Sequence, residues 1–200
     1  NNPAYPNSPS SQSYVTRLEG PLDAADNYGA RLSGFINPPV SGNYNFFISS
    51  DDGSAFYLST DANPANKVLV CSEPQWNGSR QYLILDRRNA AAPENRSSTL
   101  FPAGIPLVAG QKYYFEALIK EGGGGDNLSV AWQLPGGPLP ANGSEPISGA
   151  YLCAPADPTG VSLALTCQPA STKVCLSLSG GSAQPLFAND LNSDNGGFTV

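Results

Sequence analysis

The chain has 200 residues, a formal net charge of −6 and no histidine. Without histidine, neither a Ser-His-Asp nor a Cys-His catalytic arrangement can form within this sequence, and the commonest ligand of zinc, copper and iron is missing. The 10 basic residues are scattered rather than gathered in a stripe, so nucleic acid is not an expected partner. No apolar run reaches the roughly 18–20 residues of a membrane span, so we expect no membrane insertion.

The composition predicts an all-β protein. Glycine (21 residues) and proline (19 residues) are abundant, and methionine is absent. Short aromatic and β-branched runs recur between clusters of Gly, Pro and Asn, a pattern typical of an antiparallel β-sandwich or barrel. Residues 1–13 are mostly Asn, Pro and Ser, which predicts a tail or linker. The sequence begins with Asn1 and shows no signal peptide, so we interpret it as a mature or excised piece of a larger multidomain chain.

The strands expected from hydrophobic alternation follow one another at short intervals. In chain order they are residues 14–22, 30–37, 43–50, 55–60, 67–71, 81–86, 110–120 and 128–132. Residues 87–98 are polar and irregular, which indicates a surface loop. The composition changes near residue 155, so we predict a main domain over residues 14–154. Residues 155–200 would then form a linker with an extra β-hairpin, over residues 161–178, or the start of a second domain.

Two of these strands end in segments that could carry a site. In residues 43–50, Tyr44, Phe46 and Ile48 share one face, and the strand runs into Asp51-Asp52-Gly53. The strand over residues 110–120 ends in four glycines, residues 122–125, which are followed by Asp126 and Asn127. Glycine runs are most often flexible connections, and Asp-Gly is an ordinary turn dipeptide. From the residues alone, both segments could therefore be simple turns.

The even cysteine count favours disulfides in an extracellular protein. None of the four cysteines forms a Cys-x-x-Cys pair, so a structural zinc site has no support. Of the three possible connectivities we favour Cys71–Cys153 and Cys167–Cys175, because the second pair could close a local hairpin. Free buried thiols are the alternative.

Three ordered motifs give the chain a family resemblance. They are the run GNYNFFISSDDG at residues 42–53, AGQKYY at residues 109–114 and EGGGGDNLSVAW at residues 121–132. Together they resemble the lectin-like β-sandwich first defined in anthrax protective antigen, and the likeness covers roughly residues 14–152. The resemblance implies a jelly-roll-like antiparallel sandwich with binding loops at one end. Because members of the family differ in activity, it does not by itself fix the function.

The side chains in the two loops are oxygen donors of the kind that calcium prefers. Asp51 and Asp52 offer two carboxylates, Asp126 a third and Asn127 an amide oxygen. Neighbouring side chains of an extended strand point to opposite faces, so Asp51 and Asp52 could grip one ion only if the backbone between them departs from that pattern. Lectins of the family are known for a cis peptide bond between two such aspartates, and the resemblance implies one here. The expected metal ligands are therefore Asp51, Asp52, Asp126 and Asn127.

The function that we expect is calcium-dependent carbohydrate binding by a secreted or cell-surface lectin or adhesin module, without catalysis. Vicinal hydroxyls of a terminal sugar would reach the ion, the backbone of Gly124 and Gly125 would allow close approach, and Trp76 or Tyr57 could contact an apolar sugar face. Arg80, Lys120 and Glu121 could line the rim, although the sequence does not place them. Two alternatives stay open: a structural or protein-interaction module in which calcium only rigidifies loops, and an accessory part of a glycosidase.

Overall fold

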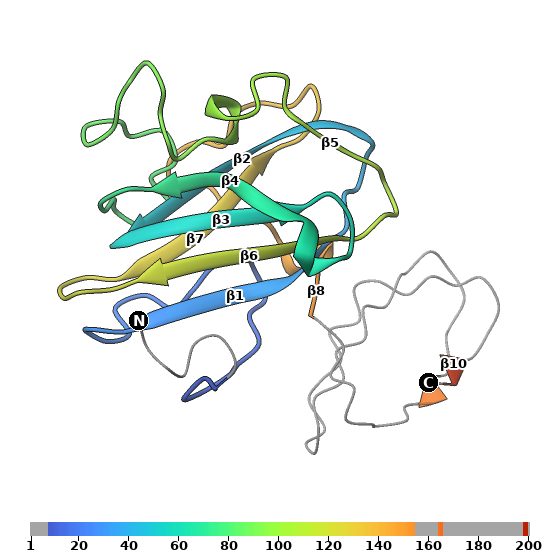
Figure 1. The fold of residues 1–200 in the computed structure, drawn as a ribbon, viewed down its shortest axis with the longest axis horizontal. Helices are drawn as coiled ribbons and strands as arrows, with labels where there is room; N and C mark the ends of the chain where they lie inside the picture. The colour runs from blue at the N-terminus through green and yellow to red at the C-terminus, as the bar shows by residue number, and fades with distance from the viewer. Residues whose placement is uncertain (1–7, 155–163, 166–197, 200) are drawn as a thin grey trace.

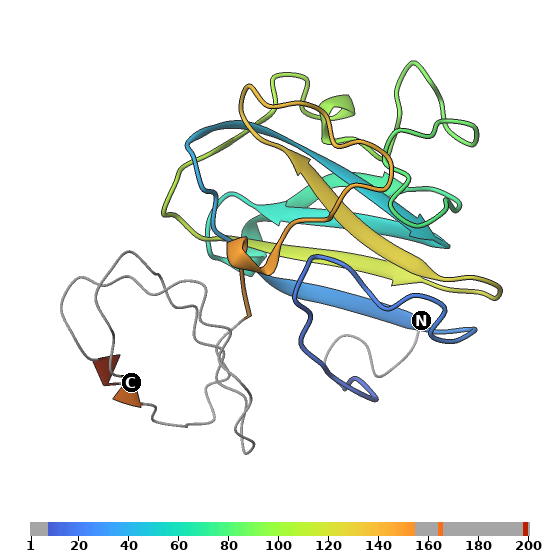
Figure 2. The ribbon, with the colours of Figure 1, turned by 180° about the vertical axis from the view of Figure 1, so that it is seen from behind.

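The computed structural model describes residues 8–154, 164–165 and 198–199, and it is all-β. Two antiparallel sheets pack face to face as a sandwich (Figure 1; Figure 2). The five-stranded sheet has the order β4-β3-β6-β1-β8, and the three-stranded sheet has the order β5-β2-β7. The strands are β1 (Gly29–Ile36), β2 (Gly42–Asp51), β3 (Gly53–Ser59), β4 (Lys67–Glu73), β5 (Ile105–Leu107), β6 (Tyr113–Lys120), β7 (Asn127–Gln133) and β8 (Leu152–Cys153).

The core lies between the two sheets and follows the predicted alternation. Tyr44, Phe46 and Ile48 of β2 are fully buried in it. The core-facing residues of β6 are those expected from the sequence: Tyr113, Phe115, Ala117 and Ile119. The rings of Phe46 and Phe56 join the two sheets, with their centroids 5.4 Å apart, a distance favourable for aromatic pairs.

The segment over residues 81–86 is not a strand, so that prediction is wrong. Its backbone forms turns, and its amides bond to side chains: the Gln81 N–H donates to Ser49 Oγ (3.0 Å) and the Leu83 N–H to Asn142 Oδ1 (2.8 Å). Tyr82 is fully buried against Phe47, in a second, smaller core. Phe47 alternates along β2 with the inward residues Phe46 and Ile48, so its side chain points to the opposite face of the sheet. This cluster therefore lies on the outer face of the three-stranded sheet. The apolar residues of the segment therefore cover a sheet face instead of pairing in a ladder.

Residues 14–22 run beside the sandwich as an extended segment with only isolated bridges. Arg17 bridges to Ser148 and Glu19 to Ser129, whereas Leu18 between them is fully buried in the main core. The expected strand is thus reduced to two single-residue pairings. The short strands β5 and β8 were not predicted, because three and two residues carry too little alternation to be recognised.

The predicted disulfide between Cys71 and Cys153 is wrong, because Cys71 is a free thiol, 1% exposed. Cys71 belongs to β4 and Cys153 to β8, which form the two opposite edges of the five-stranded sheet. Four strand spacings of about 4.8 Å separate them by roughly 19 Å, whereas a disulfide needs Cα atoms within about 7 Å. Cys167 and Cys175, the other predicted pair, lie outside the described residues.

Beyond residue 154 the structure describes only two short strands. β9 (Ala164–Leu165) pairs antiparallel with β10 (Phe198–Thr199). The second arm of the predicted hairpin, near residues 174–178, lies outside the described residues. Among the residues described, no helix has the length and apolar character needed to cross a membrane.

The packing of β1 against β8 generates a prediction about Gly34. A Cβ atom at Gly34 would lie 2.5 Å from the backbone oxygen of Cys153, whereas one at Gly29 of the same strand would meet only an ordinary 3.5 Å contact. We expect Gly34→Ala to lower the free energy of unfolding by about 1–3 kcal/mol, as overpacking does. Gly29→Ala is the matched control and should change it by about 0.5 kcal/mol or less. Urea denaturation of both variants measures the difference, and equal stabilities would contradict the packing described.

Candidate functional site

The acidic pair and the glycine loop lie at the same end of the sandwich, where the chain twice crosses between the sheets. β2 ends at Asp51 and β3 begins at Gly53, so Asp52 alone links the three-stranded sheet to the five-stranded one. The loop over residues 121–126 makes the reverse crossing, from β6 to β7. The peptide bond between Asp51 and Asp52 is cis, as the resemblance implied.

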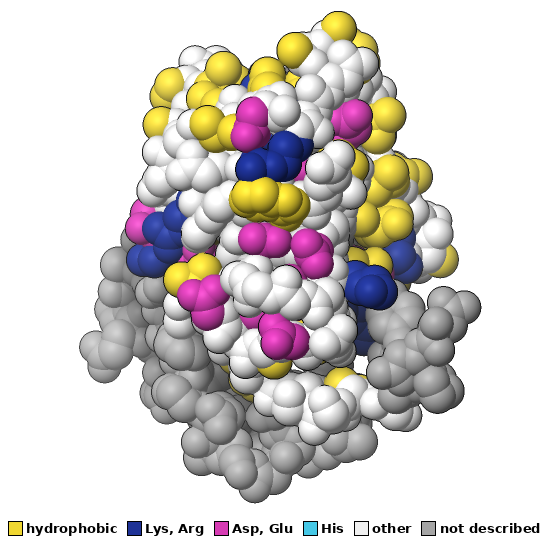
Figure 3. All heavy atoms as spheres, turned by 90° about the vertical axis from the view of Figure 1, so that its left-hand side faces the viewer, with side chains coloured by type: hydrophobic (Ala, Val, Ile, Leu, Met, Phe, Trp, Pro, Cys, Tyr) yellow, Lys and Arg dark blue, Asp and Glu magenta, His cyan; other side chains and the backbone are white. Residues whose placement is uncertain are grey.

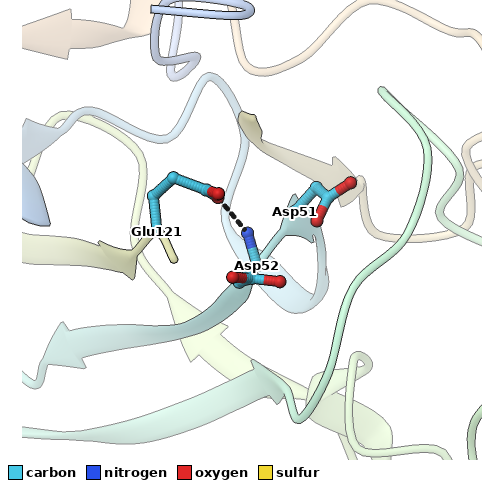
Figure 4. A group of neighbouring side chains, drawn as sticks. All are labelled: Asp51, Asp52 and Glu121. Atoms are coloured by element: carbon cyan, nitrogen blue, oxygen red, sulfur yellow. Dashed lines mark hydrogen bonds between the residues drawn. The ribbon is translucent and has the colours of Figure 1, made fainter. Parts of the chain in front are cut away.

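Three carboxylates meet at this end. Asp51, Asp52 and Glu121 each offer an oxygen atom, and the three atoms lie within 4.8 Å of one another (Figure 4). Glu121 Oε2 accepts a hydrogen bond from the Asp52 N–H (2.8 Å), and Asp52 Oδ2 accepts one from the Gly122 N–H (2.9 Å). These two bonds tie one crossing to the other.

Glu121 is the site residue that sequence reasoning underrated. It was expected at most on the rim, but it is buried, with 1% of its surface exposed. The signal was available, because Glu121 continues the odd-numbered, inward-facing series of β6 that ends with Ile119. A carboxylate at an inward position just after a strand requires a polar partner, and the Asp52 amide provides one.

Asp126 and Asn127, the other two predicted ligands, follow the glycine loop directly, and both are buried. Asp126 Oδ2 accepts hydrogen bonds from the Ala24 N–H (2.7 Å) and the Ala25 N–H (3.0 Å), so one of its oxygens anchors the loop over residues 23–27. The group of three mutually close carboxylates does not include Asp126. Asp126 therefore has at least one structural role, which is to anchor the loop over residues 23–27.

Asn127 lies directly opposite Asp51 in the β2–β7 ladder, which places both side chains on the same face of the sheet. Its Nδ2 donates to the backbone oxygen of Asn77 (3.0 Å). Its Oδ1 is buried and finds no hydrogen-bond donor in the part of the chain that the structure describes. A buried amide oxygen without a donor is costly, and a cation is one partner that would satisfy it.

The predicted glycines lie on the exposed side of the loop. Gly124 has a φ of +115°, which favours glycine, and its N–H donates to Asp26 Oδ1 (3.1 Å). A Cβ atom at Gly125 would lie 3.2 Å from Asp23 Oδ1. The loop over residues 23–27 therefore packs against the glycine loop, a contact that the sequence did not reveal.

Trp76 is half-exposed beside the acidic pair. It forms an isolated β-bridge with Asp51, and 43% of its surface is accessible. The guanidinium carbon of Arg87 lies 3.4 Å from its ring centroid. Figure 3, which views this end of the sandwich, shows basic side chains above a hydrophobic group and acidic side chains directly below it.

Asn127 also lines a shallow pocket of about 370 Å³. Arg80 lines it and is held by Glu19 through two contacts, of 2.7 and 2.8 Å, and by Glu145 at 2.8 Å. The sequence suggested Arg80 for the rim of the acidic site, and the structure places it in this pocket, whose lining does not include Asp51 or Asp52. The other residues of the pocket are Gly20, Leu22, Ser79 and Leu128.

The electrostatics of the site favour a cation. Burial and, after it, the neighbouring carboxylates of Asp52 and Glu121 raise the pKa of Asp51 from 3.8 to about 6, against the lowering effect of Arg87. The donor set consists of oxygen atoms, the ligands of hard cations such as calcium. The residues present therefore fit a calcium ion, both in donor type and in the unsatisfied Oδ1 of Asn127.

The raised pKa of Asp51 predicts an unusual pH dependence in the absence of divalent ions. The folded state holds the Asp51 proton more tightly than the unfolded chain does, so this group lowers stability as pH rises from about 4 to about 6. We expect Asp51→Asn, measured in chelator, to have a higher Tm than the wild type at pH 7, with a gap that shrinks towards pH 4. Hydrogen bonding lowers the pKa of Asp61, so Asp61→Asn should show the opposite sign. A lower Tm for Asp51→Asn at pH 7 would refute the electrostatic description.

A second prediction separates the structural task of Asp126 from metal binding. Asp126→Ala removes the acceptor of two backbone amides, so we expect it to lower the free energy of unfolding by about 2–4 kcal/mol even in chelator. Asp26→Ala, which removes one exposed contact to Gly124, is the control and should cost about 1 kcal/mol or less. Wild-type stability of Asp126→Ala in chelator would mean that this carboxylate does not anchor the loop.

Comparison with known proteins places this chain in a family. Its curated relatives include a mouse N-acetyl-beta-glucosaminyl-glycoprotein 4-beta-N-acetylgalactosaminyltransferase 1, 32% identical over 66% of this chain and 12% of the relative. Human Fibrocystin-L is 32% identical over 56% of this chain and 2% of its own length. The chain thus spans a small part of these proteins.

Two solved structures are similar to this chain, each at a TM-score of 0.40. One is an anti-sigma factor domain-containing protein from Clostridium clariflavum, 22% identical, with 64% of this chain and 33% of that chain covered. The other is the Epithelial Adhesin 9 A domain from Candida glabrata, in complex with Galb1-4GlcNAc, 17% identical, with 57% and 48% covered. The model of the PA14 domain matches residues 12–145, so the chain belongs to the PA14 domain family.

Proposed function

We propose that this chain is a calcium-dependent carbohydrate-binding module of a secreted or cell-surface protein. The observation that carries the proposal is the meeting of three carboxylates at an end of the sandwich made of loops. Directly opposite Asp51 in the ladder, Asn127 keeps a buried amide oxygen that has no donor among the described residues. Oxygen donors of this number and kind suit calcium. The module catalyses no reaction and belongs to a larger multidomain chain, in keeping with the small part of its relatives that it spans.

Asp51 and Asp52 are the principal metal ligands in this proposal. Asn127 contributes Oδ1, because it stands opposite Asp51 in the ladder and its amide nitrogen is already bonded to Asn77. Glu121 holds the Asp52 amide and so fixes the direction of the acidic pair. Asp126 keeps one oxygen, Oδ1, that accepts no hydrogen bond within the described residues and could complete the set.

Sugar recognition uses the same carboxylates a second time. When bound, calcium offers open coordination positions to two vicinal hydroxyls of a terminal sugar. Asp51 and Asp52 then accept charge-assisted hydrogen bonds from those hydroxyls, which are stronger than bonds between neutral groups. The exposed glycines, residues 123–125, leave room for a ring beside the ion because they carry no side chains. The pocket next to Asn127 offers space for further sugar residues.

One observation favours a structural role as the second candidate. The bonds from Asp52 to Glu121 and Gly122 tie the two crossings together, so an ion at this place would also rigidify the loops. In that case the module would act as a spacer or a protein-contact domain, and calcium would raise stability without creating a sugar site.

Calorimetric titration of simple hexoses in calcium tests the proposal, with chelator as the first control. We expect heat of binding in calcium and none in chelator, and Asp52→Asn should abolish binding because it removes a ligand charge. Asp61→Asn, in an acidic residue that serves the turn near Ser59, is the matched control and should bind like the wild type. Thermal unfolding in the same solutions should show a higher Tm in calcium, since a ligand that binds only the folded state stabilises it.

The outcomes separate the two candidates. A rise in Tm with calcium but no sugar heat across a broad panel would leave a structural ion and favour the spacer. An unchanged Tm together with the absence of sugar heat would refute the metal site itself.

A further inference from the structure

Arg87 and Trp76 form a basic and aromatic pair beside the acidic cluster. The Arg87 guanidinium lies over the Trp76 ring at 3.4 Å, a cation–π contact. The ring face that Arg87 covers is not available to a sugar, so Trp76 presents a charged group where an apolar platform was expected. The isolated bridge between Trp76 and Asp51 keeps this pair next to the proposed calcium ligands.

A buried ion pair holds the two loops that carry Arg87 and Trp76. The Arg88 guanidinium contacts the Glu73 carboxylate, and their side chains are 1% and 0% exposed. Glu73 Oε1 also accepts from the Gln75 N–H at 3.4 Å, directly before Trp76. A buried charge requires its partner, so this pair fixes the backbone on both sides of the contact. Arg87 is therefore presented by an anchored loop, although its own side chain is at the surface.

The ion pair that Arg87 makes among the described residues is a surface contact. Its ion pair with Asp86, at 3.0 Å, joins two side chains that are 28% and 56% exposed. Such a surface pair contributes roughly 0–1 kcal/mol, so a better acceptor can replace it. A guanidinium presents five N–H donors in a planar fork that matches a carboxylate.

The charges of the site leave Arg87 as a positive group at its edge. Asp51, Asp52, Glu121 and Asp126 supply four negative charges when ionised, and a calcium ion would supply two positive ones. Arg87 lies over Trp76, which bridges to Asp51, so its guanidinium stands beside this acidic cluster. A carboxylate on the ligand would therefore have to pair with this guanidinium.

We propose that Arg87, held on Trp76, makes the module selective for a sugar that carries a carboxylate, namely a terminal hexuronic acid. The vicinal hydroxyls lie at the Asp51–Asp52 end, and the carboxylate pairs with the guanidinium. This inference rests on the proposed function, because it assigns a ligand class to the same site. Trp76 acts as the positioning residue of Arg87.

Matched ligands test it directly. Methyl glucuronide and methyl glucoside differ only in the carboxylate, as do methyl galacturonide and methyl galactoside, and each is titrated into the full chain in calcium. For at least one pair we expect the uronide to bind about tenfold more tightly, the scale of one added hydrogen bond between charged groups. Arg87→Gln should bring the ratio of the two affinities to about one. Arg87→Lys should restore part of it, because it keeps the charge but not the fork.

The control variant is Arg31→Gln. It removes the same charge from the outer face of the five-stranded sheet, where Arg31 faces Glu116 at 4.0 Å, and it should keep the wild-type ratio. Calcium affinity, measured without sugar, is followed in every variant.

Each outcome has a separate meaning. Equal affinities for uronides and neutral glycosides in the wild type would overturn the role of Arg87 and leave the proposed function intact. A preference for uronides that survives Arg87→Gln would overturn it as well, and would assign the carboxylate to the calcium ion. If no sugar of either kind binds in calcium, the proposed function itself fails.

Discussion

The hydrogen bond from the Asp52 amide to the buried carboxylate of Glu121 joins the two places where the chain passes between the sheets. Asp52 stands between β2 and β3, and Glu121 directly follows β6, just before the four glycines of the loop. A carboxylate that is 1% exposed needs a donor, so this bond and the bond from the Gly122 N–H to Asp52 oblige the two crossings to stay in contact. The oxygen cluster at this end of the sandwich depends on that coupling.

Around the two crossings, different buried polar groups anchor different loops. Asp126 anchors the N-terminal loop through Ala24 and Ala25, and the ion pair of Arg88 with Glu73 anchors the loops near Trp76 and Arg87. Each anchor is a charged group that must be paired when it is buried. The groups left for a ligand are then the exposed faces of these loops and the oxygens that have no donor among the described residues. Anchored loops around oxygen atoms that lack donors among the described residues are the arrangement expected of a binding site.

Two kinds of support hold the residues at this end of the sandwich. The PA14 sandwich fixes the positions of the acidic pair and the glycine loop through strand pairing, whereas the loops that carry Trp76 and Arg87 are held by side-chain contacts. Changes in those loops alter the charge and shape around the centre without disturbing the ladders. In the proposed function, specificity would reside in the loops and ion binding in the strand ends.

The sequence by itself determined the all-β class and the inward faces of β2 and β6, because these follow from composition and from a period of two, which are properties of neighbouring residues. The acidic pair was singled out by the family resemblance, because local turn chemistry alone left Asp51-Asp52-Gly53 as a possible simple turn. Only the tertiary structure decided that Glu121 joins Asp51 and Asp52, that Asp126 anchors a loop, that Cys71 and Cys153 lie at opposite sheet edges, and that residues 81–86 cover a sheet face. Each of these depends on which strands are neighbours and on which buried polar group finds which partner. Both are set by contacts between residues far apart in the chain, so local patterns cannot reveal them.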